Sequence, residues 1–250
     1  QSLFYIFFKY RKSKLYLVSN PPINVFTFAI TKRKYTYLIY DLYPQVLVEN
    51  NLIGESSWLY NYWMRSNKKM FNNAAHVYTL SDGMKDQLKY ISRLQEIKVV
   101  PVWTHTTFFS DIPTAENIFI KNNELEGKFI VGYSGNLGKT HPVEKIIEIA
   151  DYLKETEDIQ FLIIGDGEKK LMLEKIQAKK KLPNLKILDF QETKLFPHVL
   201  ASFDIGVVTL EINATDLSVP SKTFDLMSAG KPIISLASHD SELASIVKTN

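Results

Sequence analysis

The start of a predicted helix carries an ammonium group, and a carboxylate follows one helical turn later. Pro220 and Ser221 fit the first positions of a helix, because a serine hydroxyl can accept hydrogen bonds from unpaired backbone amides there. Lys222 adds positive charge beside those amides, so this helix start suits an anion such as phosphate. Asp225 can accept a hydrogen bond from a sugar hydroxyl beside that anion. The combination suggests a nucleotide ligand, and an ordinary capped helix is the alternative interpretation.

A second candidate anion site is a glycine-spaced loop within residues 131–142. Gly135 and Gly138 let the backbone approach a ligand, and Lys139 adds charge. The spacing matches neither the Gly-x-Gly-x-x-Gly of dinucleotide folds nor the Gly-Lys-Ser/Thr of phosphate loops. His141 is expected either to contact the ligand or to cap the following helix. The five histidines are scattered and lack carboxylates at ligand spacing, so we predict no metal site.

The length and composition indicate a globular protein. The 250 residues suffice for one large domain or two ordinary ones, and 45% of them are hydrophobic. Cysteine is absent, which excludes a disulfide framework and a thiolate metal site and is compatible with a cytoplasmic setting. No apolar run approaches the roughly 18–20 residues of a membrane-spanning helix.

Charge is unevenly distributed along the chain, although its net value is only +3. Residues 1–100 hold 14 Lys and Arg against 6 Asp and Glu, whereas residues 101–250 hold 16 against 21. A basic half suits anionic partners such as acidic lipid headgroups or phosphorylated substrates, and it also fits a plain solvated surface. It carries no DNA- or RNA-binding motif, so we expect no nucleic acid partner.

In the first half of the chain, short β-like runs alternate with helical patterns. Asp41 follows the run at 35–40, and open α/β sheets bind ligands at this carboxyl end of their strands; capping a turn is its alternative role. Residues 58–73 form an amphipathic pattern rich in Trp, Tyr and Met, which indicates a core-facing helix or a helix lying on a bilayer. The predicted strands are 15–18, 35–40, 75–80 and 97–102, and the predicted helices are 24–30, 58–73 and 84–94.

The second half repeats the alternation, which is typical of a parallel, doubly wound sheet. Periodicity is lost over residues 103–126, so we place a linker at 109–126. This divides the chain into an α/β domain at 1–108 and another at 127–250, expected to face a cleft. The predicted strands are 129–133, 161–164, 185–188, 205–210 and 233–236, and the predicted helices are 142–154, 168–181, 195–203 and the one opening with Ser221.

Taken in order, the polar segments resemble those of the retaining glycosyltransferases of family 4, which have the two-Rossmann GT-B fold. The resemblance covers nearly the whole chain and is closest to the bacterial branch that builds surface polysaccharides on lipid carriers. Two segments, 41–44 (Asp-Leu-Tyr-Pro) and 80–84 (Leu-Ser-Asp-Gly-Met), resemble the acceptor-side domain. The donor-side segments are 133–138 (Tyr-Ser-Gly-Asn-Leu-Gly), 164–167 (Ile-Gly-Asp-Gly), 203–206 (Phe-Asp-Ile-Gly), 220–222 (Pro-Ser-Lys) and 229–232 (Ala-Gly-Lys-Pro).

The resemblance implies a metal-independent transfer of a hexosyl or N-acetylhexosaminyl group. The donor would be a nucleoside diphosphate sugar, with UDP as the expected nucleotide and no cofactor. The acceptor would be lipid-linked or a saccharide. Retention is thought to proceed by attack on the same face as the leaving group, whose phosphate oxygen helps to take the acceptor proton. The implied setting is the cytoplasm, with peripheral contact at the inner face of the membrane. A nucleotide- or saccharide-binding module without turnover is the alternative, and an epimerase on the same fold is less favoured.

The resemblance also implies roles for individual residues. Lys222 and Lys139 would be catalytic, and Asp41 would lie on the acceptor side. Asp225 would bind the ribose, at a position where the family usually has Glu. The residues implied to bind the donor are Gly135, Asn136, Gly138, Lys139, His141, Phe190 and Gln191 (which flank the base), Ser221, Lys222, Thr223 and Asp225.

Some positions depart from the family pattern. Leu217 stands where the first glutamate of the family's Glu pair is expected, and Lys222 would compensate for it. Thr140 stands near the expected basic residue, so Lys139 or His141 must serve instead. Val102 and His105 replace the common Asn and Asp of the linker. The resemblance further implies that the first strand and glycine-rich loop of the acceptor-side domain are missing and that the donor-side domain is incomplete at its end.

Overall fold

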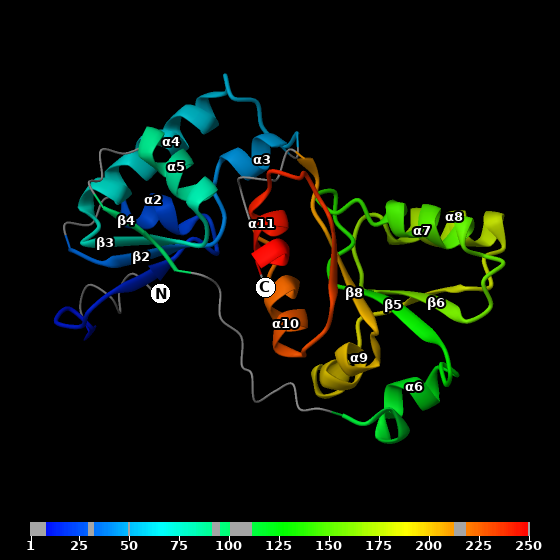
Figure 1. The fold of residues 1–250 in the computed structure, drawn as a ribbon. Helices are drawn as coiled ribbons and strands as arrows, with labels where there is room; N and C mark the ends of the chain where they lie inside the picture. The colour runs from blue at the N-terminus through cyan, green and yellow to red at the C-terminus, as the bar shows by residue number, and fades with distance from the viewer. Residues whose placement is uncertain are drawn as a thin grey trace. The chain divides into compact units, whose positions relative to one another are not determined.

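The computed structural model describes residues 9–29, 33–49, 51–91, 96–100, 112–212 and 219–249 (Figure 1). The chain forms two compact units. Of the described residues, the first unit holds those up to 100 together with Val219, and the second unit holds the remaining ones from 112 onward. Strands alternate with helices in each unit, as the sequence predicts.

The first unit is a parallel sheet in the strand order β1-β2-β3-β4. Figure 1 shows α2, α4 and α5 on one face of this sheet. Because consecutive parallel strands are joined by crossovers of one hand, helices on these connections fall on the same side. The elements are β1 (Tyr16–Val18), α2 (Asn24–Phe28), β2 (Thr36–Ile39), α3 (Gln45–Glu49), α4 (Trp58–Asn73), β3 (His76–Thr79), α5 (Asp82–Ile91) and β4 (Ile97–Val99).

Helix α4 has the bounds that the sequence predicts. Its first turn is capped by Ser57, whose hydroxyl accepts a hydrogen bond from the Tyr60 amide at 3.1 Å. Trp63, Met70 and Phe71 are buried on one side, so the apolar stripe serves the core. Trp58, at the start of the helix, is 78% exposed and lies outside that stripe.

The second unit is a parallel sheet in the strand order β7-β6-β5-β8-β9. The order reverses between β5 and β8, and open α/β sheets bind ligands at such a point, outside the carboxyl ends of the strands. The elements are η3 (Thr114–Glu116), α6 (Ile118–Asn122), β5 (Phe129–Ser134), α7 (Glu144–Tyr152), β6 (Ile159–Ile164), α8 (Lys170–Lys180), β7 (Leu185–Leu188), η4 (Thr193–Leu195), α9 (Phe196–Ser202), β8 (Ile205–Thr209), α10 (Lys222–Ser228), β9 (Ile233–Leu236) and α11 (Glu242–Thr249).

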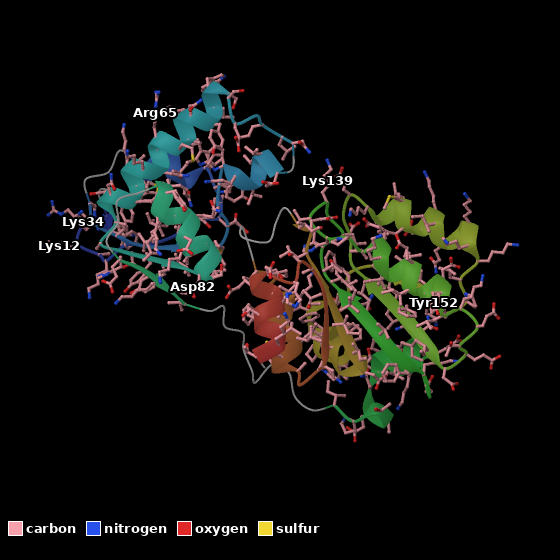
Figure 2. The ribbon with its side chains drawn as sticks, turned by 45° about the horizontal axis from the view of Figure 1, so that its top comes forward. Lys12, Lys34, Arg65, Asp82, Lys139 and Tyr152 are labelled. Atoms are coloured by element: carbon pink, nitrogen blue, oxygen red, sulfur yellow. The ribbon has the colours of Figure 1, made fainter. Side chains whose placement is uncertain are left out.

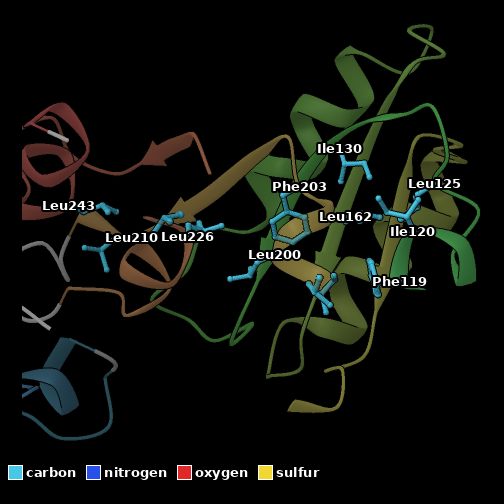
Figure 3. Close-up of a cluster of buried hydrophobic side chains, with 13 residues drawn as sticks. Phe119, Ile120, Leu125, Ile130, Leu162, Leu200, Phe203, Leu210, Leu226 and Leu243 are labelled. Atoms are coloured by element: carbon cyan, nitrogen blue, oxygen red, sulfur yellow. The ribbon is translucent and has the colours of Figure 1, made fainter. Parts of the chain in front are cut away.

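Two hydrophobic clusters hold the helices of this unit to its sheet. One cluster joins α7 and α8 to the sheet through residues such as Ile147 and Leu173. The other cluster contains α6, α9, α10 and α11 side chains, among them Leu200, Leu226 and Leu243 (Figure 3). The sheet is therefore packed on both faces, which fixes the strand ends that carry the polar loops.

The described part of the expected linker, residues 112–126, is folded onto the second unit. Asn117 caps α6, because its side-chain oxygen accepts hydrogen bonds from the amides of Phe119 and Ile120 at 3.0 and 3.3 Å. Phe119, Ile120 and Leu125 are buried in the cluster shown in Figure 3. A five-residue helix is too short to give a periodic signal, so the sequence pattern did not separate it from a loop. Residues 109–111 lie outside the described part.

Candidate functional site

The second unit has a pocket of about 290 Å³ at the carboxyl end of its sheet. The loop after β5 and the start of α10 both contribute to its wall, with α9 supplying apolar side chains. Most of the predicted donor-binding residues therefore come together here. The predicted residues that line it are Gly135, Asn136, His141, Phe190, Gln191, Ser221, Lys222 and Asp225.

A second loop supports the first one. The Gly135 amide donates to the Ile164 carbonyl at 2.9 Å, and the Leu137 amide donates to the Asp166 carbonyl at 2.8 Å. Gly165 has φ +156°, and a Cβ atom there would lie 1.9 Å from the Gly135 carbonyl oxygen. Only glycine fits this contact. The Gly-Asp-Gly segment after β6 thus shapes the pocket loop and does not itself line the pocket.

Lys222 lies across the pocket loop. Its Nζ is 2.6 Å from the Tyr133 hydroxyl oxygen. A Cβ atom added at Gly135 would lie only 2.8 Å from the same Nζ. Within the described residues, no carboxylate lies within 4.0 Å of this ammonium. Burial lowers the pKa of Lys222 from 10.5 to about 7. A partly buried cation with no carboxylate partner among the described residues is costly, and a bound anion would remove that cost.

Tyr133 holds the ammonium in place and was not singled out from the sequence. Its hydroxyl donates to the Asn136 carbonyl at 2.7 Å, so its oxygen is left to accept from Lys222. The side chain is fully buried, and this burial raises the pKa of the phenol. Tyr133 is the penultimate residue of β5, where a tyrosine resembles any core residue. Its hydrogen bonds depend on the loop that follows, which the strand pattern does not predict.

His141 is held by β8 and does not cap α7. Its Nδ1 is 2.8 Å from the Thr209 carbonyl oxygen, and α7 has no side-chain cap. Burial, reinforced by the nearby charge of Lys222, lowers the pKa of His141 to about 4. Lys169 fixes the backbone here, since its Nζ donates to the His141 carbonyl at 2.9 Å and pairs with Glu144 at 3.0 Å. Lys169 and Glu144 are further residues that sequence reasoning missed.

Two predicted residues of the pocket helix behave differently from the sequence expectation. Ser221 has helical angles, φ −59° and ψ −29°, and its side chain caps nothing. A capping serine needs extended angles, so the expected cap is wrong, although Ser221 lines the pocket. Thr223 is fully buried behind the pocket wall, and its amide donates to the Pro220 carbonyl at 3.0 Å.

Lys139, Gly138 and Asp41 do not line the pocket. The Lys139 side chain is 54% exposed and its Nζ lies 3.2 Å from Glu168, and Figure 2 shows Lys139 at the edge of its loop. Gly138 packs near Asn136, whose Nδ2 would lie 2.9 Å from an added Cβ atom.

Asp41 belongs to the first unit and follows β2, as predicted. The Ser19 hydroxyl holds this turn, because it accepts hydrogen bonds from the amides of Tyr40 and Asp41 at 3.0 and 3.3 Å. Burial raises the pKa of Asp41. Asp41 lines a small space together with Tyr43 and Trp63.

The described residues also bear on other predicted features. No group of three or more His, Asp or Glu is placed there to hold a metal ion. No helix in the same ranges has the length and apolarity to cross a membrane. Leu217, Val102 and His105, the departures from the family pattern, fall outside the described residues. Thr140 lies on the pocket loop, and its carbonyl accepts a hydrogen bond from the Glu211 amide at 3.0 Å.

Comparison with known sequences finds glycosyltransferases. The family described as glycosyl transferases group 1 matches residues 114–249. The probable glycosyltransferase WbjE of Pseudomonas aeruginosa is 24% identical over 234 residues, which are 92% of this chain and 58% of WbjE. The putative colanic acid biosynthesis glycosyl transferase WcaI of Escherichia coli K12 is 28% identical over 181 residues, 71% of this chain and 44% of WcaI. The chain thus spans about half the length of these relatives.

Comparison with solved structures confirms the GT-B fold class. HepE of Anabaena, crystallised with UDP and glucose, has a TM-score of 0.75 at 14% identity, covering 98% of this chain and 64% of HepE. WaaG, a glycosyltransferase involved in lipopolysaccharide biosynthesis, has a TM-score of 0.62 at 14% identity, covering 86% of this chain and 59% of WaaG.

Proposed function

This chain belongs to the glycosyl transferases group 1 family, and on that premise we propose that it transfers a sugar in polysaccharide biosynthesis. The donor is a nucleoside diphosphate sugar, and the acceptor is a lipid-linked or free saccharide. The reaction retains the configuration of the sugar. The relatives WbjE and WcaI, both described as glycosyltransferases, support this assignment.

One observation carries the proposal, and it is the partly buried ammonium of Lys222. It lies on the wall of an open pocket, directly above the glycine at position 135, with a phenol oxygen as its hydrogen-bond partner. An anionic ligand would supply a counterion, which the described residues do not provide within 4.0 Å, and would accept hydrogen bonds from the remaining N–H groups. A diphosphate suits this charge, and Gly135, which has no side chain, leaves room for the Lys222 ammonium beside the loop backbone.

The rest of the pocket supports a nucleotide attached to that diphosphate. Phe190 is 56% exposed on the pocket wall, and a base can stack on such a ring. Asp225 lines the same pocket and suits a ribose hydroxyl. UDP is the favoured nucleotide, in keeping with the UDP bound in HepE crystals.

The mechanism follows from where charge develops. As the glycosidic bond breaks, negative charge grows on the departing diphosphate, and a preorganised ammonium there stabilises the transition state more than the ground state. Tyr133 keeps Lys222 in position before the donor arrives. The acceptor hydroxyl attacks from the face of the leaving group, and a phosphate oxygen takes its proton. The transferred group is a hexosyl or N-acetylhexosaminyl unit, and this chemistry uses no metal ion.

The acceptor side is assigned to the first unit. Asp41 follows β2 at the carboxyl edge of that sheet, where it can bind an acceptor hydroxyl. Helix α4 contains no Asp or Glu and exposes Trp58 and Tyr62, and Figure 2 shows Arg65 on its outer side. Exposed aromatic and basic side chains together suit an anionic bilayer surface, which would bring the enzyme to a lipid-linked acceptor at the inner face of the membrane.

Calorimetry with UDP and uridine tests the donor site. We expect Lys222→Ala to weaken UDP binding by about 1.5–3 kcal/mol, the range of a charge-assisted hydrogen bond, and to spare uridine. Lys145→Ala is the matched control, because that lysine is exposed on α7 and pairs with Glu148. Unchanged UDP affinity in Lys222→Ala would rule out the diphosphate site. Release of UDP from UDP-sugar on addition of a lipid-linked acceptor then distinguishes a transferase from a binding module.

A further inference from the structure

We infer that His141 is a specificity-determining residue that accepts a hydrogen bond from a hydroxyl group of the donor and does not bind its phosphates. The inference rests on the proposed donor site and assigns one part of it. The hydroxyl belongs either to the transferred sugar or to the ribose, and the experiment below separates these two sources.

The tautomer of His141 follows from its partner. Nδ1 lies 2.8 Å from the Thr209 backbone carbonyl, and a carbonyl oxygen can only accept a hydrogen bond. Nδ1 therefore carries the proton, and in the neutral ring Nε2 carries a lone pair. Because His141 lines the pocket and Nδ1 is already used, Nε2 is the polar atom of the ring that remains for a ligand.

The surroundings keep the ring neutral. A second proton would place an imidazolium in a buried site next to the ammonium of Lys222, and both burial and that charge lower the pKa of His141 to about 4. A phosphate oxygen needs a donor, whereas a neutral Nε2 with its lone pair offers an acceptor. A ligand hydroxyl is the group that matches it.

The position of the ring is fixed before a ligand arrives. Thr209 holds it from β8, and Lys169, paired with Glu144, holds the His141 backbone carbonyl. A preorganised acceptor loses little entropy on binding, so it can select for a hydroxyl at one place. In this pocket the Lys222 ammonium then donates hydrogen bonds to the diphosphate, and Nε2 of His141 accepts one from a hydroxyl of a sugar ring.

The substitution His141→Asn isolates the Nε2 contact. An asparagine amide can replace Nδ1–H toward Thr209, but it leaves no atom at the Nε2 position. The matched control is His76→Asn, at an exposed histidine of β3 in the first unit. Calorimetry is run with four probes: methyl diphosphate, which has no sugar hydroxyl, then UDP, 2′-deoxy-UDP and UDP-glucose.

We expect His141→Asn to leave methyl diphosphate affinity unchanged and to weaken at least one hydroxyl-bearing probe about threefold to tenfold, the loss of one neutral hydrogen bond. A loss limited to UDP-glucose assigns the hydroxyl to the transferred sugar. An equal loss for UDP and UDP-glucose assigns it to the ribose, and an unaffected 2′-deoxy-UDP then identifies the 2′-hydroxyl. Equal weakening of methyl diphosphate, or no effect on any probe, overturns the inference. If the wild-type chain binds neither UDP nor methyl diphosphate, the proposed donor site itself fails.

Nitrogen NMR of the unmodified protein tests the same point without a substitution. The imidazole of His141 should show a protonated Nδ1 and an unprotonated Nε2 at neutral pH. A hydroxyl-bearing probe should shift the Nε2 signal more than methyl diphosphate does. A protonated Nε2 in the free protein would contradict the assignment.

Discussion

Replacing Lys222 by methionine should stabilise the second unit while removing donor binding. Methionine keeps an unbranched apolar side chain of similar length over Gly135 and removes the buried charge. The charge has no carboxylate within 4.0 Å in the described residues, so its removal breaks no ion pair there. The wild-type lysine is thus a group that costs stability in the free protein and contributes only when an anion binds.

The magnitude follows from the lowered pKa of Lys222, which changes from 10.5 to about 7 on folding. At 1.36 kcal/mol per pKa unit, this sets a ceiling of about 4–5 kcal/mol on the cost of the charge at pH 6. The Tyr133 oxygen loses its donor in the variant, which costs about 1–2 kcal/mol. The net gain in the free energy of unfolding should be about 2–3 kcal/mol at pH 6.

The gain must also depend on pH with a defined sign. Between pH 7 and pH 10.5 the unfolded chain keeps the lysine proton and the folded chain has released it, so the unfolding free energy of the wild type rises with pH there. The variant lacks this rise, and its advantage should shrink by about 2–3 kcal/mol from pH 6 to pH 9. Urea unfolding followed by circular dichroism at both pH values measures it. A variant that is less stable at pH 6, or an advantage that does not change with pH, would refute the reasoning.

Three further predictions concern the same pocket. Gly165→Ala should lower the free energy of unfolding by at least about 2 kcal/mol and weaken UDP binding, because its Cβ would meet the Gly135 carbonyl. Gly54→Ala, in open space, is the control and should change the free energy of unfolding by less than about 0.5 kcal/mol. Equal effects of the two substitutions in urea unfolding would contradict this prediction. UDP affinity should fall as pH rises from 7 to 9, since Lys222 releases its proton near pH 7 in the free protein; a flat profile in calorimetry would show that the charge is not used. Asp225→Ala should weaken uridine and UDP alike by about 1–2 kcal/mol, while Lys222→Ala spares uridine; equal loss of both ligands in both variants would reject this division.

Much of the fold was predictable because its signals are local. The bounds of α4 agree with its amphipathic pattern, and the strands and helices of both units alternate as their apolar runs predict. The GT-B assignment, which the comparisons confirm, came from ordered polar segments rather than from periodicity. The short helices η3 and α6, of three and five residues, gave no periodic signal within the expected linker, although Phe119 and Leu125 there are buried.

The candidate site was predictable in its residue types but not in its contacts. Lys222, Gly135 and His141 stand out by chemistry and spacing, and the pocket brings them together. The roles of Tyr133 and Thr209 depend on which strand lies beside which, so no local pattern predicts them. Lys139 is the opposite case: its charge and position favoured it, and its side chain is exposed beside Glu168 and does not line the pocket. The direction of a loop side chain is set by tertiary neighbours.

The contact between Gly165 and the Gly135 carbonyl has a consequence for anyone who wants to change donor preference by exchanging loops. The segment at 135–141 takes its shape from residues 165–169, through the hydrogen bonds of Leu137 with Asp166 and Lys169. A chimera that exchanges residues 135–141 alone would pack a foreign loop against residues 165–169, whose shape fits the original loop. The two segments form one transferable part, and a chimera should carry both.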